Sequence, residues 1–156
     1  MRQLIKSGQV AVNRRARFDY AIEDTIEAGL ALTGAEVKSI RYGLVSLVDS
    51  FVAARGDNLV VKNMPVQKLQ TASKIAGFDE RRDKQILLHK NQLNRLRGRL
   101  IEKGATIVPL KLYFNNRGII KVFLGIGFGK SKVDKRDTIR AREWDREKSR
   151  VLKSRK

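Results

Sequence analysis

The chain of 156 residues contains no cysteine and only one histidine, His89. Disulfide bridges and thiolate metal sites are therefore excluded, and so is a zinc site built from several histidines. No apolar run approaches the roughly 18 residues that span a bilayer, and residues 1–12 lack the apolar segment of a secretory signal. We therefore predict a cytoplasmic protein with no metal, no cofactor and no membrane association.

Negative charge is also scarce. Lysine and arginine number 34 against 16 aspartate and glutamate residues, which gives a formal net charge of +18. Such a charge repels itself unless an anionic partner neutralises it, and nucleic acid and anionic lipid are the candidate partners. Apolar residues make up 42% of the chain, which is enough for a core.

The clearest local pattern is a long half-buried strand. From Asp19 to Thr33, apolar residues occupy alternate positions with one polar interruption at Asp24, where we expect a bend. Gly34 ends this pattern. Val37, Ile40 and Leu44 then recur at helical spacing, which predicts a short helix that stops near Gly43.

Two hairpins and a second helix follow. Residues 50–55 and 59–63 flank a turn at Gly56-Asp57-Asn58, and residues 108–114 and 120–128 flank a turn at residues 115–118. Residues 86–88 form a short strand or the approach to a helix, which continues through Leu93, Leu96 and Leu100. The predicted face of one late strand contains Val108, Leu110, Leu112 and Phe114, and that of the other contains Ile120, Val122, Leu124, Ile126 and Phe128.

These elements predict a mainly β fold with short helices. Five or six antiparallel strands suit a small, closed or nearly closed barrel of the oligonucleotide-binding type, because a barrel removes exposed strand edges. We assign residues 1–129 to this domain, and we expect Leu110, Leu112, Val122 and Leu124 to be buried.

The composition changes after the barrel. From Gly129 onward there are 12 Lys and Arg against 5 Asp and Glu, and apolar residues are few. Such a segment cannot bury enough apolar area to order itself. Opposite charges at i,i+3 favour a helix by a few tenths of a kcal/mol per pair; the pairs are Arg140/Glu143, Glu143/Arg146, Asp145/Lys148 and Glu147/Arg150. We expect residues 130–156 to be disordered alone and helical on a partner.

No constellation of residues predicts catalysis. The carboxylates of Asp19, Glu23, Asp24 and Glu27 are divided between two strand faces, and His89 has no evident partner. Basic residues instead form islands at four places, which indicates RNA binding by a small barrel. The alternatives are a permanent ribosomal protein and a metal-dependent nuclease. Charge and periodicity alone do not distinguish a permanent ribosomal protein from an RNA-binding adaptor.

Several runs of residues resemble one bacterial family. They are Asn13–Tyr20, Glu27–Leu30, Leu32–Arg41, Asp49–Phe51, Ile86–Lys90, Val108–Phe114 and Asp134–Asp137. Together, in unbroken order from about Gln9 to the C-terminus, they resemble the SsrA-binding protein family, also called small protein B. The resemblance implies an oligonucleotide-binding-like barrel with a tail, and no catalysis.

The resemblance also implies partners. A member of this family is expected to act as a monomer, to bind the tRNA-like part of transfer-messenger RNA (tmRNA) and to accompany it into a stalled ribosome. There the tail is expected to lie in the decoding centre and the empty messenger channel, and the nascent peptide is tagged for degradation.

The family motifs imply particular site residues. Glu36 matches a glutamate needed for RNA binding, either as a direct acceptor or as a group that holds a neighbouring arginine. The remaining predicted RNA contacts are Asn13, Arg14, Tyr20, Leu88 and His89 from the motifs, and Arg15, Lys38, Arg41, Lys130 and Lys132 from the basic islands. The predicted ribosome-binding residues of the tail are Asp134, Lys135, Arg136, Trp144, Lys148, Val151 and Leu152. Phe18 departs from the family pattern, in which histidine is common at this position.

Overall fold

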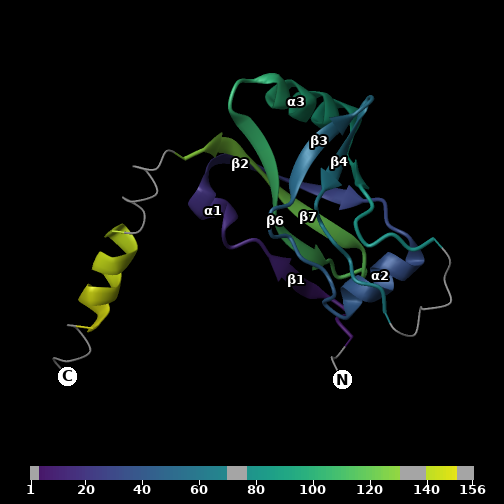
Figure 1. Cartoon of the computed structure of the whole chain (residues 1–156), viewed down its shortest axis with the longest axis horizontal. Coiled ribbons are helices and arrows are strands. Elements are labelled where there is room, and N and C mark those ends of the chain that lie inside the picture. The colour runs from purple at the N-terminus through teal and green to yellow at the C-terminus, as the bar shows by residue number, and fades with distance from the viewer. Residues whose placement is uncertain (1–3, 70–76, 131–139, 151–156) are drawn as a thin grey trace.

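The computed structural model describes residues 4–69, 77–130 and 140–150, and it contains seven strands (Figure 1). In chain order the elements are β1 (Gly8–Val12), α1 (Ala16–Asp19), β2 (Tyr20–Leu30), α2 (Gly34–Arg41), β3 (Phe51–Arg55), β4 (Asn58–Lys62), β5 (Lys84–Leu87), α3 (Lys90–Ile101), β6 (Ala105–Phe114) and β7 (Ile120–Gly129). Residues 140–150 form a further helix.

All seven strands belong to one antiparallel sheet with the order β1-β6-β7-β2-β5-β4-β3. The sheet curls so that β3 lies against β6. In the described part of the chain, β1 and β3 remain the ends of the hydrogen-bonded ladder, so the sheet is barrel-like but not closed. The prediction of a mainly β, oligonucleotide-binding-like fold with short helices is therefore confirmed.

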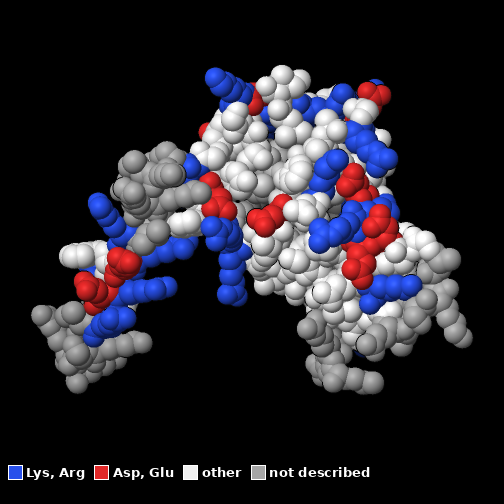
Figure 2. All heavy atoms as spheres, in the orientation of Figure 1, with Lys and Arg blue, Asp and Glu red and all other residues white. Residues whose placement is uncertain are grey.

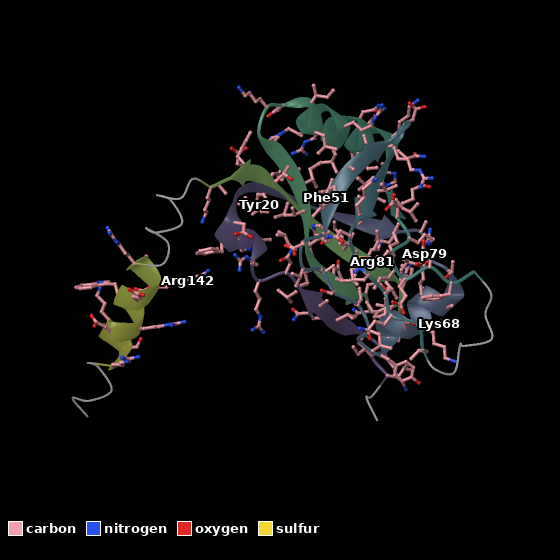
Figure 3. All side chains as sticks on the ribbon, in the orientation of Figure 1. Tyr20, Phe51, Lys68, Asp79, Arg81 and Arg142 are labelled. Atoms are coloured by element: carbon pink, nitrogen blue, oxygen red, sulfur yellow. The ribbon has the colours of Figure 1, made fainter. Side chains whose placement is uncertain are left out.

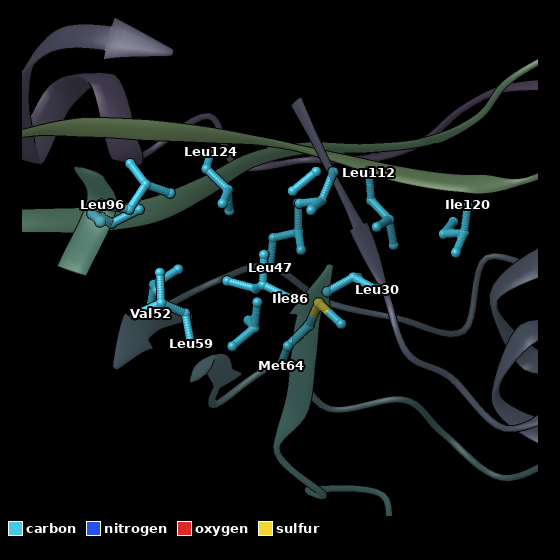
Figure 4. Close-up of a cluster of buried hydrophobic side chains, with 14 of the residues drawn as sticks. Leu30, Leu47, Val52, Leu59, Met64, Ile86, Leu96, Leu112, Ile120 and Leu124 are labelled. Atoms are coloured by element: carbon cyan, nitrogen blue, oxygen red, sulfur yellow. The ribbon is translucent and has the colours of Figure 1, made fainter. Parts of the chain in front are cut away.

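The core fills the inside of the curled sheet, and α2 and α3 lie at its two ends (Figures 1 and 4). Leu96 of α3 and Ile40 of α2 are fully buried in it, together with aliphatic residues from the strands. The four residues predicted to be buried, Leu110, Leu112, Val122 and Leu124, are at most 7% exposed. The burial of these four residues was therefore predicted correctly.

Two β-bulges change which residues share a face. In β2 the register shifts between Ile22 and Asp24, at the predicted bend, and in β6 it shifts between Pro109 and Lys111. A bulge adds one residue and so moves the following side chains to the other face. Val108 and Leu110 consequently pack with Ala16 in a second cluster on the outer face, and not with Leu112 and Phe114 as predicted.

Two elements were not predicted from the sequence. The strand β1 pairs with β6, and the single-turn helix α1 follows it. Both are short: β1 has five residues and α1 has four, so neither repeats an apolar pattern long enough to be recognised. Together they place residues 13–19 beside the edge of the sheet (Figure 1).

The glycines near the end of β7 allow two strands to approach closely. A Cβ atom at Gly127 would lie 2.0 Å from the carbonyl oxygen of Ala21. Because that neighbour is backbone, it cannot move away without breaking the β2–β7 ladder at its bulge. This explains Gly125-Ile126-Gly127 as a packing feature of the strand.

We predict that Gly127→Ala destabilises the fold by about 2 kcal/mol, the usual size of an overpacking penalty. The thermal midpoint should then fall by roughly 4–8 °C. Gly129→Ala is the matched control, because a Cβ atom there meets nothing within 4 Å. Thermal unfolding followed by circular dichroism measures both variants, and equal midpoints for the two would contradict the close approach.

Candidate nucleic-acid interface

The N-terminus of α2 is closed by a reciprocal pair of hydrogen bonds. The backbone N–H of Glu36 donates to Thr33 Oγ1 at 3.2 Å, and the backbone N–H of Thr33 donates to Glu36 Oε1 at 2.9 Å. This capping box satisfies two N–H groups that the first helical turn leaves without partners. It also fixes the direction of the Glu36 carboxylate.

The carboxylate of Glu36 faces the guanidinium of Arg82, which lies just before β5. Arg82 Nη2 donates to Oε1 at 2.5 Å and Arg82 Nε donates to Oε2 at 3.3 Å. Arg82 Nη2 also donates to the carbonyl of Ala31 at 3.1 Å, beyond the end of β2. The planar guanidinium of Arg82 thus joins α2, β2 and the segment before β5. Lysine, whose ammonium is a single point charge, cannot form these paired hydrogen bonds.

A second cation lies beneath this pair. Lys84 is 0% exposed, and its Nζ donates to the carbonyl of Met64 at 2.7 Å. Burial lowers the pKa of Lys84, and the negative charge of Glu36 partly opposes this effect. For Glu36, burial alone raises the pKa, but the hydrogen bonds from Arg82 and Thr33 and the charges of Arg82 and Lys84 outweigh burial, so its pKa lies below the usual value.

Glu36 is therefore an internal ion. Its side chain is 3% exposed, and both carboxylate oxygens accept hydrogen bonds from within the protein. Of the two roles considered for this residue, the geometry favours holding an arginine over accepting directly from RNA.

Exposed cations surround the network. Lys38 lies on α2, and Arg81 lies beside Asp79 and Lys68 near that helix (Figure 3). Figure 2 shows basic and acidic side chains mixed over this side of the molecule. Lys62 pairs with Asp83 at 3.6 Å across an exposed surface, a contact that contributes little to stability.

Asn13 was predicted to contact RNA, but it is buried. Its side-chain amide donates to the carbonyls of Leu47 at 3.2 Å and Pro109 at 3.1 Å, and the residue is 8% exposed. Asn13 therefore ties the loop before β3 to β6. The arrangement assigns it a structural role, and only its neighbours Arg14 and Arg15 reach the surface.

Arg41 is also occupied within the fold. Its guanidinium lies 4.2 Å from the centroid of the Phe114 ring. Its Nη1 donates to the carbonyl of Ile5 at 3.0 Å, and its Nη2 donates to the carbonyl of Gly118 at 3.0 Å. Arg41 thus clamps the N-terminal segment and the β6–β7 turn to the end of α2, and the prediction that it contacts RNA does not fit this geometry.

The predicted residues near α1 do gather on one surface. Arg15 pairs with Asp19 at 3.3 Å and lies 6.0 Å from the Phe18 ring, and Tyr20 begins β2 next to them. A pocket of about 220 Å³ lies between this segment and the start of β3, with Tyr20 and Phe51 in its lining (Figure 3). Lys130 joins the group through its backbone N–H, which donates to the carbonyl of Asp19 at 2.9 Å.

Leu88 and His89 lie at the opposite end of β5 from Arg82. Leu88 is half-buried and packs against the core, whereas the side chain of His89 is exposed. His89 is the N-cap residue of α3, although only its carbonyl, which accepts from Leu93 at 2.9 Å, takes part. The structure therefore separates these two residues from Glu36 by the length of a strand.

The chain is similar to one known protein family over most of its length. A family model described as "SmpB protein" matches residues 10–154, which includes the sheet, α2 with Glu36 and the helix at residues 140–150. The chain belongs to the SmpB family.

Related SmpB family proteins are similar over almost the whole chain. An SsrA-binding protein from Rhodopseudomonas palustris strain TIE-1 is 47% identical over 146 residues, which is 94% of this chain and 92% of the relative. One from Methylorubrum populi is 44% identical over 144 residues, or 92% and 91% of the two chains. A solved structure described as "tmRNA-SmpB: a journey to the center of the bacterial ribosome" has a similar chain, with a TM-score of 0.65 and 42% identity over 86% of this chain and 95% of that one.

The tail of this SmpB family member is described only at residues 140–150, which form a helix in the free chain. Trp144 is 61% exposed, and Lys148 Nζ lies 5.6 Å from its ring centroid. The expected i,i+3 ion pairs do not approach within 4.0 Å among these residues. The remaining predicted tail residues, Lys132, Asp134, Lys135, Arg136, Val151 and Leu152, lie outside the described residues.

Within the described ranges, no group of three or more metal-binding side chains occurs, and none of the helices is long and apolar enough to cross a membrane.

Sequence reasoning missed the internal cations of the SmpB family fold. Arg82 and Lys84 belong to one of the four basic islands that were taken to indicate RNA binding, but in the fold both interact with Glu36. The run Thr33-Gly34-Ala35-Glu36 contained a signal for the position of this carboxylate. A threonine three residues before a glutamate predicts a capping box, in which the carboxylate points back toward the start of the helix.

We predict that Glu36→Gln lowers the free energy of unfolding by roughly 2 kcal/mol at neutral pH, because glutamine keeps the capping box but removes the carboxylate that pairs with Arg82 and attracts Lys84. The pKa of Glu36 is lowered by folding, so its contribution is complete above the ordinary value of 4.5 and is lost as the pH falls through the lower folded value. The difference in the free energy of unfolding between variant and wild type should therefore become smaller below pH 4.5.

Urea titrations at a series of pH values measure this difference. Asp57→Asn is the control, because it removes an equal charge from a fully exposed partner of Arg97 and should leave the curve unchanged. A difference for Glu36→Gln that stays constant down to the acid limit would show that its charge does not stabilise the fold.

Proposed function

We propose that this SmpB family member is an RNA-binding adaptor that binds the tRNA-like part of tmRNA and delivers it to stalled ribosomes. The observation that carries the proposal is the similarity, over 86% of the chain, to a chain from a tmRNA-SmpB structure. The net charge of +18 supports an RNA partner independently. In this function the protein is a cytoplasmic monomer that catalyses no reaction, and rescue ends with tagging of the nascent peptide.

Two surfaces would divide the RNA contacts. The first surrounds α2, where the pair of buried Glu36 and partly exposed Arg82 holds the helix that carries exposed Lys38. The second surrounds α1, where Arg14, Arg15, Tyr20 and Lys130 gather. Contacts of lysine and arginine with phosphates fit recognition of a folded RNA by its shape. Leu88 and His89 form a third point of contact, at the start of α3.

Asn13, Glu36 and Arg41 enter this function as positioning residues. Each holds a segment that carries exposed cations: Asn13 holds the segment that leads to Arg14, Glu36 holds α2, and Arg41 holds the end of that helix. Their substitution should therefore weaken RNA binding through misplacement of neighbouring residues.

The tail is proposed to act on the ribosome, in the decoding centre and the messenger channel. The helix at residues 140–150 is exposed along its whole length, with Trp144 as its one large apolar side chain. An exposed tryptophan on a basic helix fits insertion into an RNA-walled channel, where the ring stacks and the cations neutralise phosphates. We propose the same location for Asp134, Lys135, Arg136, Lys148, Val151 and Leu152, and an RNA contact for Lys132.

We predict that truncation after Gly129 leaves tmRNA binding largely intact and abolishes peptide tagging, because the barrel keeps all of the proposed RNA-contact residues except Lys130 and Lys132. A gel shift with purified tmRNA, next to a tagging assay on stalled ribosomes, measures the two activities separately. Loss of the gel shift on truncation would place the tail in the primary tmRNA site.

Within the tail, Trp144→Ser should reduce tagging more than Arg150→Ser. The ring is a single apolar anchor, whereas Arg150 is one of many cations. The same tagging assay compares these two variants, and an equal or larger effect of Arg150→Ser would show that charge alone directs the tail.

Sequencing the RNA that copurifies with the full chain separates the proposal from a permanent ribosomal role. Enrichment of tmRNA supports the adaptor. Ribosomal RNA in fixed proportion, without tmRNA, would support a ribosomal component instead.

A further inference from the structure

The outer face of the sheet carries a groove that borders the proposed RNA contact Arg14, but none of the proposed contacts explains its apolar floor. Its volume is about 530 Å³, and its apolar floor consists of Val12, Leu110 and Phe123. The bulge in β6 creates this floor, since it turns Leu110 outward beside Phe123 of β7. Around the floor stand four cations, Arg14, Arg17, Lys111 and Arg142, and three polar side chains, Gln9, Asn13 and Thr25.

The charges of the groove are unbalanced. No carboxylate belongs to the described residues that line it. Two carboxylates of β2 lie nearby and are engaged by other residues: Asp24 pairs with Arg95, and Glu27, which stands opposite Phe123 in the β2–β7 ladder, hydrogen-bonds to Tyr113. Four like charges around one low-dielectric cavity focus a positive potential into it, and an anion relieves their repulsion.

The aromatic wall of the groove is held in a fixed position. The ring of Phe123 stacks on Tyr113 with centroids 5.5 Å apart and an angle of 23° between the planes. Lys111 Nζ lies 5.2 Å from the centroid of Tyr113 and 5.4 Å from that of Phe123. A ring held in this way offers a platform to a flat ligand with little loss of side-chain entropy.

The tail helix supplies the last cation. Arg142 extends from residues 140–150 toward α1, where its guanidinium lies 5.9 Å from the centroid of the Phe18 ring (Figure 3). The groove is thus bordered both by Arg17 of α1 and by Arg142 of the tail helix. This places the beginning of the helical tail next to the basic groove of the barrel.

We propose that this groove binds one unpaired RNA nucleotide, with its base against Phe123 and Leu110 and its phosphates between Arg14 and Arg17. An apolar floor with a stacked ring suits a base, and a rim of arginines suits phosphate. A groove of this volume lies within the range of small-ligand sites. This inference rests on the proposed function for the choice of RNA as the ligand. Its test requires neither tmRNA nor a ribosome.

Fluorescence anisotropy with a labelled tetra-adenylate RNA tests the proposal on the full chain. The comparison ligand is a tetramer with the same backbone and no bases. Wild type should bind tetra-adenylate roughly tenfold or more tightly than the abasic strand, the size expected from one stacked base. Equal affinity for the two ligands would overturn the proposal.

Two variants locate the binding. Arg14→Gln with Arg17→Gln should weaken both ligands, whereas Arg55→Gln with Arg117→Gln, which removes two exposed arginines elsewhere, should weaken them much less. Phe123→Val, which keeps a strand-forming residue, should remove the preference for the base while binding of the abasic strand persists. Equal losses in the two arginine pairs, or an unchanged preference in Phe123→Val, would contradict the groove.

An acidic hexapeptide identifies the alternative occupant. If hexaglutamate displaces tetra-adenylate at equal concentration, the groove binds an acidic protein segment and the proposal is wrong; if it does not, the nucleotide is supported. A gel shift of each variant with tmRNA keeps the two proposals separate. Failure of wild type to shift tmRNA rejects the proposed function, whereas failure to distinguish the two tetramers rejects only the groove.

Discussion

The ion pair between Glu36, which is buried, and Arg82, which is partly exposed, determines how the basic surface of this protein is presented. It joins the start of α2 to the end of β2 and to the segment before β5, and the backbone ladder between β2 and β5 holds the last two of these close together. A carboxylate held away from water requires good geometry and further hydrogen bonds. The capping box at Thr33 and the carbonyl of Ala31 supply these, so the pair is stable only when all three segments are in place.

The same constraint sorts the cations of a strongly basic chain into two groups. Lys84 is fully buried and donates to a carbonyl inside the fold, so it is not available to a ligand. Arg82 and Arg41 also donate to oxygens of the fold, but they are only partly buried. Arg14 and Lys38 are exposed, and Lys38 lies on the helix whose two ends Arg82 and Arg41 hold. Net charge therefore overstates the RNA-binding surface. We propose that a single carboxylate matters in this way for binding RNA that it does not touch.

Long periodic segments made much of this fold predictable from the sequence. The alternation in β2, β6 and β7 and the apolar spacing in α3 extend over ten or more residues, and these elements were found with nearly correct ends. The bulge at Asp24 was visible as a polar interruption, but the one at Pro109–Lys111 was not, because Val108, Leu110 and Leu112 continue the alternation without a break. Strand β1 was missed because its stability comes from pairing with β6, a contact that local pattern does not encode.

The site was harder to predict than the fold, since exposure decides the role of each residue. Asn13 and Arg41 were expected to contact RNA, and for Glu36 both a direct contact with RNA and the holding of an arginine were considered. The partner of Glu36 is 46 residues away along the chain, and only the folded sheet brings Arg82 to it. Arg14 and Lys38, by contrast, are exposed, as a contact with RNA requires.

The central claim is that Glu36 acts on RNA through Arg82, and a double-mutant cycle on tmRNA affinity tests it most directly. The cycle compares wild type, Glu36→Gln, Arg82→Gln and the double variant, each first shown to be folded at the assay temperature. If Glu36 acts only by holding Arg82, the double variant should bind tmRNA as tightly as whichever single variant binds it less tightly. The coupling energy of the cycle should then be close to the loss of binding free energy that Glu36→Gln causes alone. Additive losses, with no coupling, would show that Glu36 contributes to the RNA complex independently of Arg82 and would contradict this account.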